Sequence, residues 1–134
     1  MKKIKQDLNV FGHKSEKCSL EPLTGAYRDG CCNTGPSDYG THSVCAVVDD
    51  KFLRFSKSMG NDLISDNPAY NCKGLKPGDK WCLCVSRWIQ AYNAGCAPKV
   101  ILESTNIKTL EYISLNELSN YSINHKEQSN LNQS

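Results

Sequence analysis

The sequence lacks a long apolar segment. Its longest uninterrupted apolar runs, 44–48 and 81–85, have five residues each, whereas a membrane-spanning helix needs about 20. The first fifteen residues contain lysines but neither an apolar stretch nor a small-residue cleavage site, so they do not read as a secretory signal. We therefore expect no membrane association and a cytoplasmic location.

A strong excess of one charge is also missing. The formal net charge is +2, and the N-terminal Lys2, Lys3 and Lys5 together exceed it, which leaves the remaining chain close to neutral. Nucleic-acid-binding domains usually carry a basic face or stripe. We therefore expect no nucleic-acid partner.

Cysteine pairs at the spacing of common zinc sites are absent as well. The sequence contains no C-x-x-C, which is the usual signature of a structural zinc site. The eight cysteines make up about 6% of the chain, below the ~8–10% typical of short secreted disulfide scaffolds. In the cytoplasm most of them should remain thiols, and a persistent disulfide would indicate catalysis or redox sensing.

What is present fits one small domain. A chain of 134 residues with 39% hydrophobic content suits a single core. Residues 1–8 are lysine-rich and residues 122–134 are rich in Asn, Gln and Ser, so we predict a flexible N-terminus, a globular domain over 9–121 and a disordered polar tail. Turn-forming residues fill 21–40 and indicate a long ordered loop region near the N-terminus.

Strands and short helices are predicted after this loop region. The first strand is apolar and β-prone, and the helix after it repeats apolar side chains at helical spacing until a glycine. The predicted strands are 42–48, 81–85, 99–104 and 110–113. The predicted helices run from Asp49 or Asp50 to Gly60, from a Ser86 cap to Gly95, and over 115–121. This order predicts an α+β or α/β fold with a mixed sheet of about four strands.

The second predicted strand has a chemical consequence. In a strand, Cys82 and Cys84 lie on one face, whereas in a helix their side chains would point about 200° apart. Joined by Cys45 from a neighbouring strand and by Cys31 or Cys32 from the loop, they could form a thiolate cluster for zinc or another soft metal.

Two other roles stay open for the cysteines. Arg28 and the glycine-rich backbone could make Cys31 or Cys32 a reactive thiol, while the strand cysteines could simply pack as small hydrophobic residues. A disulfide between the two adjacent thiols would need a strained turn. We predict that one of them anchors the loop beside the second strand and that the other faces a polar pocket near His42.

Polar residues at turns and element ends form a second candidate site. Binding sites are often built at such positions, and a pocket there would suit a small-molecule ligand. The same Asp and Asn side chains could instead cap turns, with an arginine pairing to an aspartate. The candidates are Arg28, Asp29, His42, Asn61, Asp62 and Arg87.

Four segments resemble a bacterial family known as domain of unknown function 2237. They are PLTGAYRDGCCNTGPSDYGTHSVCAV, FSKSMGNDL, GLKPGDKWCLCVSRW and AGCAPKVILESTN, and the resemblance extends from residue 9 to about residue 121. It implies a small, single-domain, cytosolic protein, without indicating an activity. Cys72 and Cys96 lie outside the family pattern, and the departure at 70–73 affects only a loop. The cysteines that the pattern includes are Cys18, Cys31, Cys32, Cys45, Cys82 and Cys84.

Two classes of function follow from these patterns. The first is a thiol- or metal-dependent site, built from the cysteine-rich loop and the Cys82/Cys84 strand and drawing on the six cysteines of the family pattern. The second is a non-catalytic module that binds a small molecule or a protein and uses its cysteines structurally. A site of the first class could belong to an enzyme or to a redox sensor, so the sequence leaves enzymatic activity open.

Overall fold

The computed structural model describes residues 7–68 and 73–124. Most of the predicted flexible N-terminus and polar tail, residues 1–6 and 125–134, lies outside the described residues, as does Cys72.

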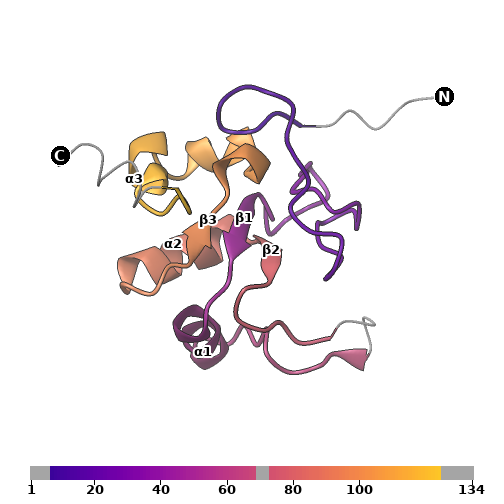
Figure 1. The fold of residues 1–134 in the computed structure, drawn as a ribbon, viewed down its shortest axis with the longest axis vertical. Coiled ribbons are helices and arrows are strands. Elements are labelled where there is room, and N and C mark those ends of the chain that lie inside the picture. Colours follow the sequence, from indigo (N-terminus) through magenta and orange to yellow (C-terminus); the bar gives the residue numbers. More distant parts are fainter. Residues whose placement is uncertain (1–6, 69–72, 125–134) are drawn as a thin grey trace.

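A three-stranded antiparallel sheet forms the centre of the domain (Figure 1), with the order β2-β1-β3. The strands are β1 (Val44–Val47), β2 (Lys80–Leu83) and β3 (Lys99–Val100). On β1, Cys45 lies directly opposite Cys82 of β2, and Ala46 lies between Trp81 and Val100. The central strand is therefore paired at both edges, and its side chains Val44, Cys45 and Ala46 are fully buried, as its continuous apolar sequence predicts.

Within the described residues, three short α-helices and the 3₁₀ helices η2 and η3 accompany the sheet, which makes the domain a small α+β fold. They are α1 (Asp50–Ser58), η2 (Leu102–Ser104), η3 (Ile107–Glu111), α2 (Val85–Asn93) and α3 (Leu115–Ser119). Asp49 caps α1 as predicted, because its Oδ1 accepts a hydrogen bond from the backbone N–H of Phe52 at 2.7 Å. The predicted Ser86 cap is wrong, since α2 already begins at Val85.

The predicted mixed sheet of about four strands is wrong within the described ranges. The third strand ends at Val100, and residues 110–113, predicted to form a fourth strand, fall at the end of η3 and just after it. The physical reason is a local cap: the side chain of Asn106 accepts a hydrogen bond from the backbone N–H of Lys108 at 2.8 Å. This bond caps η3, so the chain is already helical at 107–111, where the predicted fourth strand would begin.

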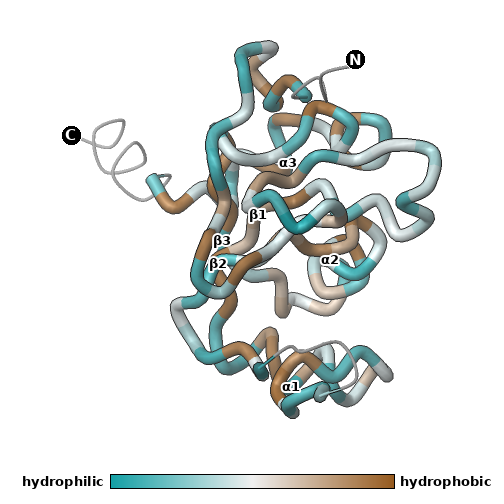
Figure 2. The backbone as a smooth tube through the Cα atoms, turned by 90° about the vertical axis from the view of Figure 1, so that its right-hand side faces the viewer, coloured by the Kyte–Doolittle hydropathy of each residue, from teal (hydrophilic) through white to brown (hydrophobic). Residues whose placement is uncertain are grey.

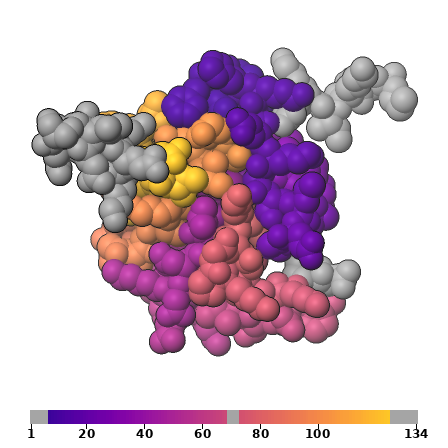
Figure 3. All heavy atoms as spheres, viewed as in Figure 1, coloured from indigo at the N-terminus to yellow at the C-terminus, as the bar shows by residue number. Residues whose placement is uncertain are grey.

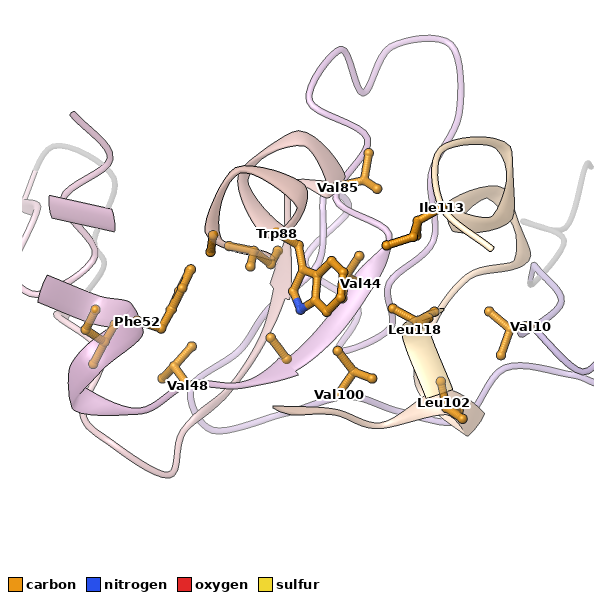
Figure 4. Close-up of a cluster of buried hydrophobic side chains, with 14 of the residues drawn as sticks. Val10, Val44, Val48, Phe52, Val85, Trp88, Val100, Leu102, Ile113 and Leu118 are labelled. Carbon is orange, nitrogen blue, oxygen red and sulfur yellow. The ribbon is translucent and has the colours of Figure 1, made fainter. Parts of the chain in front are cut away.

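The main core lies around Trp88, a residue of α2 that is fully buried. Figure 4 shows its indole among Val44, Val100 and Leu118, which come from β1, β3 and α3. The indole Nε1–H donates to the carbonyl of Pro98 at 3.2 Å, so the buried polar atom is satisfied. Along the chain, Figure 2 shows apolar stretches at the strands and the inner faces of the helices.

Residues 7–43, which precede β1, lack long regular elements and are held by contacts with distant residues. Figure 3 shows it lying beside residues near 100–110. The amide of Asn106, only 1% exposed, donates to Asp7 Oδ2 at 2.6 Å and to the Cys32 carbonyl at 3.0 Å. One buried side chain thus ties the N-terminus and the cysteine-rich loop to η3.

Replacing Asn106 with alanine tests this connection. We expect Asn106→Ala to lower the free energy of unfolding by about 2–3 kcal/mol, because the buried Cys32 carbonyl and the half-buried Asp7 carboxylate both lose a donor. Urea denaturation measures the change, and Asn116→Ala, at an exposed position of α3, is the control. Equal stability of the two variants would contradict the assigned role.

Candidate functional site

Four cysteines from four segments meet in one buried cluster. Cys45 and Cys82 face each other across β1 and β2, and each forms a disulfide with a cysteine of the N-terminal region. The bonds join Cys18 to Cys45 and Cys32 to Cys82, with Cα separations of 5.7 and 5.2 Å. None of the four is more than 4% exposed, and Ile101 packs against them. We call these residues the four-cysteine cluster.

Three of the four sulfurs form one close group. The Sγ atoms of Cys18, Cys32 and Cys82 all lie within 4.8 Å of one another, and the sulfur of Cys45 is bonded to that of Cys18. In a tetrahedral zinc site, Zn–S bonds of about 2.3 Å place the sulfurs roughly 3.8 Å apart. The group has the ligand type and spacing to hold a metal, although the same cysteines are paired here as disulfides.

Hydrogen bonds fix the backbone of both strand cysteines. The N–H of Cys45 donates to Thr105 Oγ1 at 3.1 Å, and the N–H of Cys82 donates to Thr24 Oγ1 at 2.8 Å. Both threonines are fully buried. The cluster is therefore held by the sheet and by two side chains from outside it, so its geometry does not depend on the disulfides alone.

Cys84 does not join the cluster, contrary to the sequence expectation. Strand β2 ends at Leu83, and Cys84 is the N-cap residue of α2. Its Sγ lies 3.1 Å from Ser86 Oγ. Because the strand ends at Leu83, Cys84 no longer alternates with it and does not share the strand face of Cys82.

Cys31 and Cys32 have different environments. Cys32 anchors the loop beside β2 through its disulfide, as we predicted for one of the pair. Cys31 keeps a buried thiol and does not line the cavity described below. Burial raises its pKa, as does the Asp29 carboxylate, against the opposing charges of Lys17 and Lys14. This environment disfavours a thiolate nucleophile at Cys31.

A cavity of about 580 Å³ lies beside the cluster. Of the six polar candidates, Arg28, His42, Asn61 and Asp62 line it, together with Trp81. The remaining two serve other contacts. Asp29 accepts hydrogen bonds from the Cys31 N–H and the Asn33 amide, and Arg87 donates to the Met59 carbonyl and to Gln90.

Asp38 and His42 form the most defined polar pair in this cavity. The imidazole Nδ1 lies 2.6 Å from Asp38 Oδ1, and the side chains are 42% exposed for His42 and 4% for Asp38. Oδ2 accepts from the His42 N–H at 2.8 Å and from Thr34 Oγ1 at 2.9 Å. Burial raises the pKa of Asp38, but the hydrogen bonds from His42 and Thr34 outweigh it and hold the pKa below its ordinary value.

The pair fixes the orientation of the imidazole. An ionised carboxylate only accepts hydrogen bonds, so Nδ1 carries a proton and Nε2 is the remaining polar atom of the ring. Asp38 is one of the turn-region polar residues from which the sequence predicts such a pocket, whereas Trp81 was not among the sequence candidates.

Two strained backbone positions flank the cavity. Arg28 and Thr41 are the non-glycine residues with positive φ in the described part of the chain, at 55° and 47°. Such angles are uncommon outside glycine and tend to occur at functional sites. Arg28 is held with its guanidinium 5.7 Å from the centre of the Trp81 ring, and Thr41 directly precedes His42.

The structure defines a small α+β domain with a four-cysteine cluster beside a polar cavity. No helix within residues 7–68 and 73–124 is long and apolar enough to span a bilayer. The chain belongs to domain of unknown function 2237, an uncharacterised protein family conserved in bacteria, which it matches over residues 8–122. This match confirms the resemblance seen in the sequence motifs. No curated protein matches the chain significantly.

The low pKa of Asp38 predicts a pH-dependent contribution to stability. The carboxylate has a lower pKa in the folded state, so its stabilising effect is present above the unfolded pKa of about 3.9 and is lost as the pH falls through the folded value. We expect Asp38→Asn to cost about 1–3 kcal/mol at neutral pH and progressively less in acid.

Denaturation curves between neutral pH and pH 2 measure this difference. Asp50→Asn is the control, because Asp50 is exposed on α1 and pairs only with exposed Arg54. A penalty for Asp38→Asn that stayed constant over the acid range would contradict a role for the ionised carboxylate.

Proposed function

We propose that the domain is a thiol-dependent metal-binding protein that responds to oxidation. In the reduced state the four-cysteine cluster would bind one zinc ion or another soft metal ion, and in the oxidised state it forms two disulfides. The observation that supports this most directly is the spacing of three sulfurs within 4.8 Å, with the fourth bonded to one of them.

The positions of the cysteines in the sheet favour a metal site over two independent structural disulfides. Cys45 and Cys82 sit opposite each other in a hydrogen-bonded register, so their thiols would stay adjacent after reduction. Thiolate sulfur selects zinc, copper(I) or iron–sulfur centres, and a buried site excludes competing water. Disulfides that only stabilise the fold, as in the second class of function, would not need to lie next to each other.

The redox step balances with a peroxide as the oxidant. A zinc tetrathiolate carries a net charge of −2. Two molecules of hydrogen peroxide accept four electrons from the four thiolates, and four protons complete the formation of four water molecules. Two S–S bonds form, and zinc leaves as Zn²⁺ with its oxidation state unchanged.

Native mass spectrometry of the full chain tests the proposal. After reduction and removal of the reductant under anaerobic conditions, we expect one zinc ion per chain with a dissociation constant below about 1 μM. Peroxide should release that ion and leave a protein lighter by four hydrogens than the reduced apoprotein. Failure of the reduced protein to retain zinc would contradict the proposal.

Cysteine variants identify the ligands. Cys18→Ser and Cys82→Ser should each abolish tight zinc binding, since a hydroxyl is a poor substitute for a thiolate. Cys84→Ser and Cys96→Ser are matched controls, because neither residue belongs to the four-cysteine cluster. Cobalt substitution adds a second readout, as tetrahedral thiolate ligation gives strong visible absorption. Loss of zinc in all four variants alike would remove the cluster as the ligand set.

A further inference from the structure

We infer that the cavity beside the cluster is a site of thiol–disulfide exchange, in which a small thiol compound reduces the Cys32–Cys82 disulfide and His42 accepts the thiol proton. This step returns the cluster from the disulfide state to the reduced state, so its purpose rests on the proposed function. The exchange itself requires only the oxidised protein.

The cavity reaches one end of the Cys32–Cys82 disulfide. Cys82 lines the cavity and is 2% exposed, whereas Cys32 is completely buried and is not among the lining residues. A thiolate attacks one sulfur of a disulfide and displaces the other. A thiol in the cavity therefore forms its mixed disulfide with Cys82, and Cys32 is the leaving group.

His42 supplies a base to the same cavity. Its side chain lines the cavity and is exposed on one side, while Nδ1 is held by Asp38 Oδ1 at 2.6 Å. Within the described residues, the hydrogen bonds of His42 use its backbone N–H and Nδ1, so Nε2 stays free to accept a proton. Because the thiolate and not the thiol attacks a disulfide, a base beside the bond increases the reactive fraction of a bound thiol at neutral pH.

The backbone before His42 keeps the imidazole at this position. A Cβ atom at Gly40 would lie 2.6 Å from His42 Cε1, closer than side chains approach one another, so glycine leaves room for the ring. Thr41, directly before His42, has a positive φ of 47°, and strain of this kind tends to occur at functional sites. The loop thus holds the ring at the cavity at a conformational cost.

The other disulfide provides an internal comparison. Cys18 of the Cys18–Cys45 bond lines a separate, smaller cavity of about 370 Å³, so both disulfides can be approached from one end. The described residues around this smaller cavity supply carboxylates and lysines but no histidine. A carboxylate is too weak a base to take a thiol proton efficiently at neutral pH. A thiol should therefore react faster with Cys32–Cys82.

The charged side chains of the larger cavity favour neither sign of charge in the thiol. Arg28 and Lys73 are matched by Asp38 and Asp62. An uncharged thiol is therefore the appropriate probe. The volume of about 580 Å³ lies within the roughly 300–1,000 Å³ typical of small-molecule sites.

The atoms and electrons of the exchange balance. The thiol R–SH gives its proton to His42 Nε2, and R–S⁻ bonds to Cys82 Sγ as the Cys32–Cys82 bond breaks. Cys32 leaves as a thiolate and takes the proton from the imidazolium. A second R–SH releases R–S–S–R and leaves Cys82 as a thiol, so two small thiols give two electrons to one protein disulfide.

Reduction of the oxidised full chain by 2-mercaptoethanol tests the inference. The buffer is neutral and free of metal, and samples are quenched with acid, alkylated and mapped by mass spectrometry. We expect an initial rate at Cys32–Cys82 at least about tenfold higher than at Cys18–Cys45, since a general base typically contributes about 10²–10⁴-fold. The first mixed disulfide should form on Cys82. Tris(hydroxypropyl)phosphine, an uncharged reductant with no thiol proton to remove, should show no such preference.

His42→Gln tests the role of the imidazole. Glutamine cannot take up a thiol proton, so we expect the reaction of Cys32–Cys82 with 2-mercaptoethanol to slow about tenfold or more and its reaction with the phosphine to stay unchanged. Above the pKa of the free thiol the difference should disappear, because the thiol then ionises without a base. His13→Gln is the control, because His13 is exposed and lines neither of the two cavities.

Gly40→Ala provides a second variant should His42→Gln fail to fold. Its added Cβ displaces the imidazole, so it should slow the thiol reaction at Cys32–Cys82 but not the phosphine reaction.

Three outcomes would overturn the inference: equal thiol rates at the two disulfides of the unsubstituted chain, the same preference with the phosphine, or a His42→Gln variant that slows both reductants alike. Because the assay starts from the oxidised protein without metal, failure of exchange and failure of zinc binding are distinguished directly.

Discussion

The antiparallel register of β1 and β2 is the constraint on which the cluster depends. It places Cys45 opposite Cys82, and each of these residues holds one cysteine of the N-terminal region. From residue 7 up to β1, that region has no long helix or strand of its own with which to bury its backbone groups. Its position therefore follows from the strand register, from the two bonds made there and from the Asn106 amide.

The cluster and the cavity share parts of the same scaffold. Cys82 belongs to the cluster and also lines the cavity, as does Thr24, whose hydroxyl accepts from the Cys82 N–H. Arg28 lies four residues before Cys32 on the loop that the Cys32–Cys82 disulfide anchors. The Cys32–Cys82 disulfide thus anchors the same loop that supplies Arg28 to the cavity lining.

The sequence predicted local features better than distant contacts. Asp49 capping α1 followed from local chemistry, whereas the anchoring of the loop beside β2 was predicted for one of two adjacent cysteines without deciding between Cys31 and Cys32. Cys84 was misplaced because a shift of one residue at a strand end changes what a side chain faces, and the fourth strand failed because a single cap at Asn106 outweighed β-propensity. The bond from Asn106 to Asp7 spans 99 positions, beyond the reach of any local pattern, and four cysteines allow three pairings that spacing cannot separate.

The pairing of the cluster cysteines bears on the cellular compartment in which the protein is expected. We predicted a cytoplasmic protein with most cysteines reduced, whereas four of them are paired within the described residues. A cytoplasmic location stays a prediction, and it is compatible with this pairing if the cluster alternates between disulfides and a metal-bound state. Buried thiols lose hydration without gaining strong partners, while a metal ion supplies four bonds to the same sulfurs. Metal binding would thus stabilise the reduced fold at the place where reduction removes two covalent links.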